Sequence, residues 1–301
     1  MKANDVLLDH PTLIPQTNES RSRFKANYNR ADFMLTHSLH QSELFSMPAL
    51  LDLAQRLSAI PGAVYFNIGR LGVDRGWDFN KDHSFSAESA LEQIQTSDAW
   101  MILRKVQREP AYGEVLDNIL SEVHEASERK YVGLTHSQNI SIILTSPNRI
   151  TPYHFDADCN YLLQIHGSKI IHVFDGSDRS VVTPQELEHF YLGDINAAQY
   201  KPLLEGKSHC YELIPGTGVH VPVTFPHWVQ NHNNISVSAS INFCFNDETV
   251  PDLHRVNHYL RRARLNPRQP GKSGLADSMK GVTASLLRAI GKLKPTASES
   301  N

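Results

Sequence analysis

From residue 139 onward, apolar and polar positions alternate in short runs separated by turn residues, which is the pattern of β-strands. In the last run, 236–245, apolar side chains share one face and small polar side chains share the other. We expect the apolar face to pack against a covering layer and the polar face, which includes Asn242, to line a wet pocket. Many short strands predict a sandwich or jelly-roll barrel. The predicted strands are 139–145, 151–156, 160–166, 169–174, 211–214, 218–222, 227–231 and 236–245.

The chain before residue 139 mixes helical and strand patterns. Apolar positions in 110–126 repeat at i, i+3, i+4 and i+7, which predicts an amphipathic helix with one buried stripe. Residues 1 to about 45 are polar and are expected to form an irregular arm. The remaining predictions are a helix that opens at Ser46 and ends before Pro61, a short helix at 88–95, and strands at 63–68 and 100–106.

These patterns predict a mainly β fold with helical additions, namely a sandwich or a jelly-roll barrel. We expect N-terminal helices and outer strands in 1–135, the barrel core in 136–250, and a basic helical tail in 251–301. An insertion at 176–209 contains Thr183-Pro184-Gln185-Glu186, whose N-cap, proline and acidic residue predict a short helix. Insertions of this kind often shape the entrance of a barrel.

The tail contains two predicted helices joined by a linker rich in Pro and Gly. A helix with an apolar stripe docks on its own domain, on a second copy, or on nucleic acid or membrane, and we favour a homodimer. The stripe of the second helix comprises Leu275, Met279, Val282, Leu286, Ile290 and Leu293.

The net charge of the 301-residue chain is −3, which provides no general reason to expect a nucleic-acid partner. The charge is uneven, because 251–301 holds ten Lys or Arg against three acidic residues. The three Cys are an odd number without Cys-x-x-Cys spacing, which fits a reduced protein. No signal-peptide pattern and no apolar run of membrane-spanning length is present, so a cytoplasmic location is expected.

The candidate chemistry begins with His154 and Asp156, whose side chains share one face of an extended strand. Such a pair can hold one metal ion, but a single His-x-Asp is weak evidence in a chain with 16 His. One His, one carboxylate and a second His from elsewhere form the facial triad of non-haem Fe(II) oxygenases. The second His has three candidates, His220, His227 and His232, of which His227 is favoured.

The spacing of further residues strengthens this prediction. Lys169 follows His154 by fifteen residues, and Asn242 follows His227 by the same interval. With these residues in place, the sequence resembles the JmjC and cupin-like 2-oxoglutarate oxygenases, most closely the asparaginyl hydroxylases that modify a hypoxia-inducible transcription factor. The residues that fall in register with that group are Thr151, His154, Asp156, Asn160, Lys169, His227 and Asn242.

The resemblance implies a double-stranded β-helix (jelly-roll, cupin-like) barrel and a role for each of these residues. His154, Asp156 and His227 would bind Fe(II) and form the catalytic centre. Lys169 and Thr151 would hold the distal carboxylate of the co-substrate 2-oxoglutarate, and two amides, Asn160 and Asn242, would line its iron end. The implied reaction consumes O2 and 2-oxoglutarate, hydroxylates a C–H bond, and releases succinate and CO2.

Several alternatives stay open. The substrate would be a protein side chain or a small molecule, and a non-catalytic cupin-like regulatory or ligand-sensing protein is the contrasting hypothesis. The resemblance is specific over about 139–245. Within it, Cys244 stands where the asparaginyl hydroxylases carry an aromatic residue. The tyrosine that contacts 2-oxoglutarate in that group is not placed, and Tyr65 and Tyr131 are candidates for it.

Overall fold

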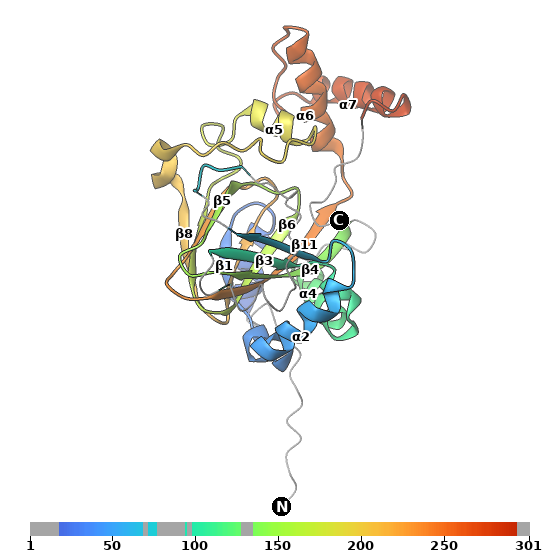
Figure 1. Ribbon diagram of the computed structural model, residues 1–301. Helices are drawn as coiled ribbons and strands as arrows, with labels where there is room; N and C mark the ends of the chain where they lie inside the picture. Colours follow the sequence, from blue (N-terminus) through green and yellow to red (C-terminus); the bar gives the residue numbers. More distant parts are fainter. Residues whose placement is uncertain (1–17, 69–71, 77–93, 95–97, 128–134, 294–301) are drawn as a thin grey trace, which may run out of the picture.

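Two antiparallel β-sheets face each other in the computed structural model and enclose a barrel (Figure 1). The structure describes residues 18–68, 72–76, 94, 98–127 and 135–293. The larger sheet has the strand order β1-β9-β6-β11-β4-β3-β2, and the smaller has the order β5-β10-β7-β8. The strands are β1 (Phe33–Thr36), β2 (Val64–Ile68), β3 (Ala99–Leu103), β4 (Thr135–Thr145), β5 (Ile150–His154), β6 (Cys159–His166), β7 (Lys169–Val173), β8 (His209–Leu213), β9 (Thr217–Val221), β10 (His227–Asn231) and β11 (Ser236–Phe245).

The alternation predicted for β11 explains how the layers form. Val237, Ala239 and Ile241 are fully buried in the main core, which lies between the larger sheet and the N-terminal helices. The opposite face of β11 presents Ser240 and Asn242 to the barrel interior. One face of the strand therefore stabilises the fold and the other lines the cavity. This arrangement confirms the predicted jelly-roll barrel.

The helices cover the barrel at two places (Figure 1). α1, α2 and α4 pack on the outer face of the larger sheet, where the stripe predicted for 110–126 is buried. α5, α6 and α7 lie together at the other end of the molecule. The helices are α1 (Asn18–Asn27), α2 (Met47–Ser58), α4 (Pro110–Ser127), α5 (Pro184–Phe190), α6 (Thr249–Arg262) and α7 (Gly274–Ala289). None of these described helices has the length and apolar character needed to cross a membrane.

Two predicted elements need correction, and a third cannot be compared with the structure. The arm predicted to be irregular contains α1 and β1, and β1 extends the larger sheet by pairing with β9. Its apolar run is too short to predict a strand by itself, and Phe33 and Leu35 are buried in the main core where β1 pairs with β9. The strand predicted to end at residue 106 ends at Leu103, since Lys105 adopts a positive φ of 59°. The helix predicted at 88–95 falls outside the described residues, apart from Ile94.

The insertion at 176–209 contains the predicted short helix, α5, with its capping box in place. The side chains of this insertion pack on the outer face of the smaller sheet, around Tyr153, Phe155 and Trp228. Among the described residues that line the barrel cavity, none comes from the insertion. Its expected role in shaping the entrance is therefore not supported by the described part of the chain.

Candidate metal centre

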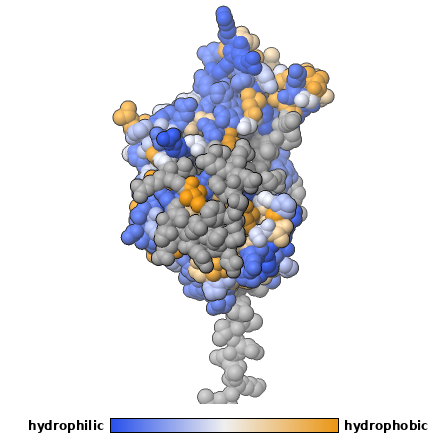
Figure 2. Space-filling model, in the orientation of Figure 1, coloured by the Kyte–Doolittle hydropathy of each residue, from blue (hydrophilic) through white to orange (hydrophobic). Residues whose placement is uncertain are grey.

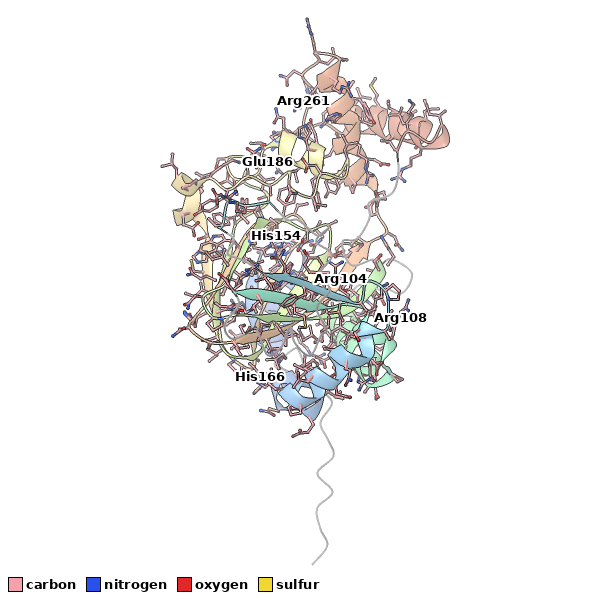
Figure 3. The ribbon with its side chains drawn as sticks, viewed as in Figure 1. Arg104, Arg108, His154, His166, Glu186 and Arg261 are labelled. Atoms are coloured by element: carbon pink, nitrogen blue, oxygen red, sulfur yellow. The ribbon has the colours of Figure 1, made fainter. Side chains whose placement is uncertain are left out.

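His154, Asp156 and His227 meet inside the barrel. Their potential ligand atoms all lie within 4.8 Å of one another. Asp156 is central, since its Oδ1 lies 3.8 Å from His154 Nε2 and its Oδ2 lies 3.8 Å from His227 Nε2. In Figure 3, His154 lies at the end of the barrel that faces α5, and His166 lies at the opposite end.

A β-bulge in β5 determines which side chains face the cavity. His154 pairs with His227 and Thr151 pairs with Val229, so Pro152 and Tyr153 together oppose the single residue Trp228. The extra residue brings Thr151 and His154, which are three positions apart, to the same side of the strand. Both side chains line the cavity as a result.

Asp156 lies beyond the end of β5, which corrects the predicted strand 151–156. The alternation of sides nevertheless continues, because Phe155 is buried in the outer cluster while Asp156 lines the cavity. The backbone N–H of Thr224 donates to the Asp156 carbonyl at 2.9 Å and replaces the lost strand pairing. Thr224 itself has a φ of 59°, an uncommon conformation for a β-branched residue.

Both histidines are prepared to act as metal ligands. The Nδ1–H groups of His154 and His227 donate to the carbonyls of Pro152 at 2.7 Å and Phe225 at 3.0 Å. This assignment leaves each Nε2 with a lone pair directed at the carboxylate. Burial lowers the pKa of each imidazole to about 4. The rings are therefore neutral near pH 7, which metal binding requires.

Lys169 lies in the same cavity and is 3% exposed. Among the described residues, its ammonium group has no hydrogen bond and no ion pair. Burial lowers the pKa of Lys169 from 10.5 to about 7. A buried cation without a partner raises the free energy of the folded state. The position of Lys169 therefore favours an anionic ligand in this cavity. Thr151, which lines the same cavity, is available as a second donor.

A row of amides crosses the larger sheet within the cavity wall. Asn242 pairs with Asn160 on β6 and with Asn139 on β4. Asn160 Nδ2 donates to the Asn242 side-chain oxygen and, at 2.8 Å, to Ser240 Oγ, while Asn242 Nδ2 donates to Asn139 Oδ1 at 3.3 Å. The sequence analysis identified two of these residues and missed Asn139. The only available signal was the cross-strand register, which is a tertiary property.

The two competing histidines have other roles. His220 is fully buried, its Nδ1–H donates to the Asn160 carbonyl at 3.1 Å, and its Nε2 accepts from the backbone N–H of Asn29 at 3.0 Å. His232 is exposed and lies 2.7 Å from Glu212 Oε1. Neither belongs to the group of ligand atoms around Asp156.

All seven residues predicted from the sequence line one cavity of about 140 Å³. The cavity also contains residues that the sequence analysis did not select, among them Trp100, Arg104 and Asp158. Asp158 accepts a hydrogen bond from the thiol of Cys244 at 2.6 Å. Of the two candidate tyrosines, Tyr65 packs on Trp100 without lining the cavity, and Tyr131 falls outside the described residues.

The donor set matches a defined class of metal site. Two imidazoles and one carboxylate on one side of a cavity leave coordination positions free, as in non-haem Fe(II) oxygenases. Lys169, which has no partner among the described residues, supplies the opposite charge that an anionic co-substrate needs. The residues present therefore fit both Fe(II) and 2-oxoglutarate.

Comparison with solved structures supports the fold. The sequence matches no protein-family model and no curated protein. Similar structures include YcfD from Escherichia coli, a ribosomal oxygenase, at a TM-score of 0.52 and 14% identity, covering 94% of this chain and 69% of that one. A second YcfD structure has a TM-score of 0.54 and 15% identity, with coverages of 94% and 70%.

A third YcfD structure, in complex with cobalt and 2-oxoglutarate, has a TM-score of 0.52 at 14% identity and covers 93% of this chain and 69% of its own. At such low identity the likeness establishes the fold and no more. The chain therefore has the jelly-roll fold that is also found in 2-oxoglutarate oxygenases. The resemblance to asparaginyl hydroxylases in particular stays a prediction.

Proposed function

We propose that this protein is an Fe(II)- and 2-oxoglutarate-dependent oxygenase. The observation that carries the proposal is Lys169, a buried cation without a partner among the described residues, in the same cavity as a two-His, one-carboxylate cluster. A metal site alone needs no lysine. A dicarboxylate that binds a metal at one end and an ammonium group at the other accounts for both features.

In this proposal, His154, Asp156 and His227 hold Fe(II), while Lys169 and the Thr151 hydroxyl bind the distal carboxylate of 2-oxoglutarate. Asn160 and Asn242 supply amide groups at the iron end. When bound with 2-oxoglutarate and O2, the iron supplies the oxidant that hydroxylates a C–H bond, with release of succinate and CO2. The chain itself orients the co-substrate and limits the entry of water.

We favour a protein side chain as the substrate. The cavity holds about 140 Å³, roughly the volume of a cavity that takes one benzene ring, so bound 2-oxoglutarate would leave little room beside the iron. A side chain presented by a polypeptide needs only the mouth of such a cavity, whereas a free small molecule needs room inside it. YcfD, a ribosomal oxygenase of the same fold, is consistent with a macromolecular substrate.

An anaerobic titration of the purified protein with Fe(II) and 2-oxoglutarate tests the proposal. We expect a weak visible charge-transfer band when both are bound, and succinate after O2 is admitted. Lys169→Met should retain the iron and lose the band at 2-oxoglutarate concentrations that saturate the unsubstituted protein. Iron binding with no band in the unsubstituted protein would favour the alternative, a cupin-like regulatory protein.

A separate experiment tests whether the substrate is a protein or a small molecule. Once succinate formation is established, peptide libraries and free amino acids can be compared for their ability to increase it. Stimulation by peptides alone would support a protein substrate. Stimulation by a free small molecule would favour the small-molecule hydroxylase.

A further inference from the structure

The residue between two of the proposed ligands points away from the metal centre. Phe155 lies between His154 and Asp156, is 1% exposed, and belongs to the apolar cluster outside the smaller sheet. Its ring meets the ring of Phe190 edge to face, with centroids 4.7 Å apart. A displacement of the Phe155 backbone would move the adjacent residues His154 and Asp156, and therefore both ligands.

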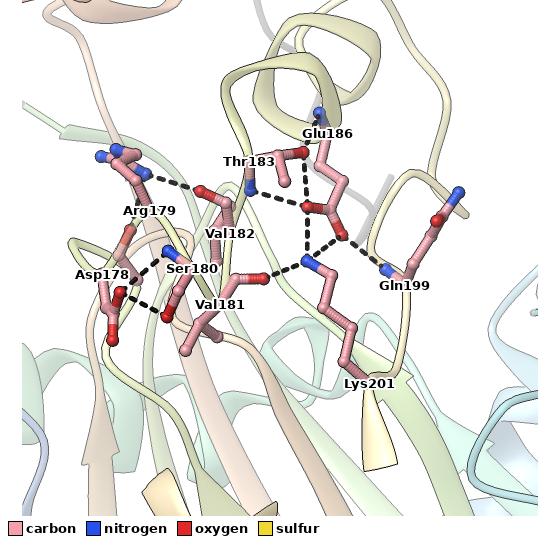
Figure 4. A network of polar contacts seen from close by, with 10 residues as sticks. Asp178, Arg179, Ser180, Val181, Val182, Thr183, Glu186, Gln199 and Lys201 are labelled. Carbon is pink, nitrogen blue, oxygen red and sulfur yellow. Dashed lines mark hydrogen bonds and ion pairs between the residues drawn. The ribbon is translucent and has the colours of Figure 1, made fainter. Parts of the chain in front are cut away.

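Phe190 is the last residue of α5, and the start of this helix is held tightly (Figure 4). The buried carboxylate of Glu186 accepts from the Thr183 N–H at 2.7 Å, from the Gln199 N–H at 2.9 Å, and from Lys201 Nζ at 3.0 Å. The Lys201 ammonium also donates to the Val181 carbonyl at 2.5 Å. The two halves of the insertion are thus joined at one carboxylate.

The other side of α5 is attached to α6 by buried charges. Glu188, which is 1% exposed, accepts from Arg261 Nε at 2.9 Å. Arg255, 2% exposed, donates from Nε to the carbonyl of Tyr191 at 2.8 Å, directly after the helix. Buried charged groups tolerate little displacement, because an unpaired charge in the interior is costly. Figure 3 shows Glu186 and Arg261 on the same side of the barrel, above His154.

We propose that the insertion and α6 form a buttress that positions the metal ligands from outside the barrel, with Phe155 and Phe190 as its positioning residues. This proposal rests on the proposed metal site. It also explains why the insertion is held by many hydrogen bonds and ion pairs although none of its described residues lines the cavity. Residues that orient ligands without touching the metal typically change metal affinity by about 10–100-fold when substituted.

The test is calorimetric titration of metal-free protein with Mn(II), without 2-oxoglutarate or O2. Phe190→Ala should weaken Mn(II) binding by about 10-fold or more, and Phe190→Leu, which refills most of the space, should restore most of the affinity. Phe45→Ala is the control, because Phe45 is also a buried ring but belongs to the other core. It should lower the melting temperature without changing Mn(II) affinity.

A second variant covers the case in which Phe190→Ala does not fold. Arg261→Gln acts at a partly exposed side chain on α6 and removes the charge partner of Glu188. It too should weaken Mn(II) binding. Equal Mn(II) affinity in Phe190→Ala, Arg261→Gln and the unsubstituted protein would overturn the buttress alone. Failure of the unsubstituted protein to bind Mn(II) would overturn the buttress together with the proposed function.

Discussion

At the scale of single residues, the identity of a side chain predicts its chemistry less well than its surroundings do. His220 and His227 are both buried histidines with a lowered pKa, but their partners differ. Both ring nitrogens of His220 are engaged by backbone groups, whereas only Nδ1 of His227 is. The free Nε2 lone pair makes His227 the candidate ligand.

This difference between the two histidines can be tested with two separate substitutions. His227→Ala should abolish Mn(II) or Fe(II) binding and leave the fold intact, because it removes one of only three ligands. His220→Ala should lower stability by about 1–3 kcal/mol, since buried backbone groups lose their partner, and it should retain the metal. Metal content of the purified variants, measured with their melting temperatures, decides between these outcomes. Retention of metal by His227→Ala would remove it from the site.

Lys169 should make the stability of the ligand-free protein depend on pH. Its folded-state pKa of about 7 lies below the ordinary 10.5, so between these values the unfolded chain binds a proton that the folded chain does not. Stability should therefore rise with pH from about 7 to about 10.5. Lys169→Met should lack this slope and be more stable near pH 7, by on the order of 3–5 kcal/mol.

Urea denaturation of both proteins between pH 6 and pH 10, without metal or 2-oxoglutarate, measures this effect. Lys207→Met is a suitable control, because the Lys207 side chain is about half exposed. Parallel stability curves for Lys169→Met and the unsubstituted protein would show that Lys169 is not destabilised by burial.

At the scale of elements, local sequence rules hold where the element is stabilised by its own residues. α5 begins with a capping box, and Thr183 and Glu186 make the contacts expected from their spacing. β1 is the opposite case, because four residues become a strand only through pairing with β9. The bulge in β5 likewise depends on its partner, β10.

Two substitutions in the capping box should lower the stability of the protein by different amounts. Thr183→Ala should cost about 0.5–2 kcal/mol, the usual range for a lost N-cap. Glu186→Ala should cost more, because it also removes the acceptor for Gln199 and Lys201. Thermal unfolding of the two variants shows which substitution lowers stability more. Equal losses would mean that Glu186 acts only as part of the cap.

At the scale of the whole molecule, α7 exposes an apolar face (Figure 2). Leu275, Met279, Val282, Leu286 and Ile290 are each between 64% and 77% exposed. The opposite side of the helix packs on α6 through Ala284, and Arg288 pairs there with Asp252. The exposed stripe contains five of the six residues predicted from the sequence, whereas the sixth, Leu293, is buried with Val256 and Ala284. The homodimer inferred from the stripe stays a prediction.

The dimer can be tested on the full chain. The five side chains of two copies would bury on the order of 1,000 Å², close to the roughly 1,200 Å² at which stable interfaces begin. Val282→Glu combined with Leu286→Glu should convert a dimer into a monomer in sedimentation experiments. Leu203→Glu is the control, because Leu203 is 99% exposed and lies outside the stripe. A monomeric unsubstituted protein would rule out this use of α7.

The sequence by itself determined most of the barrel strands and the capped helix, because strand alternation and capping are local properties of the chain. It also identified the seven cavity residues, because their spacing resembles that of a known group of oxygenases. Only the tertiary structure showed that Asn139 joins the amide row, that β1 completes the larger sheet, that His220 is a structural histidine, and that the insertion lies against the outer wall. These features depend on pairing between residues that are far apart in the sequence. No local pattern encodes such pairings, since the register and the burial of each side chain arise only when the sheets close.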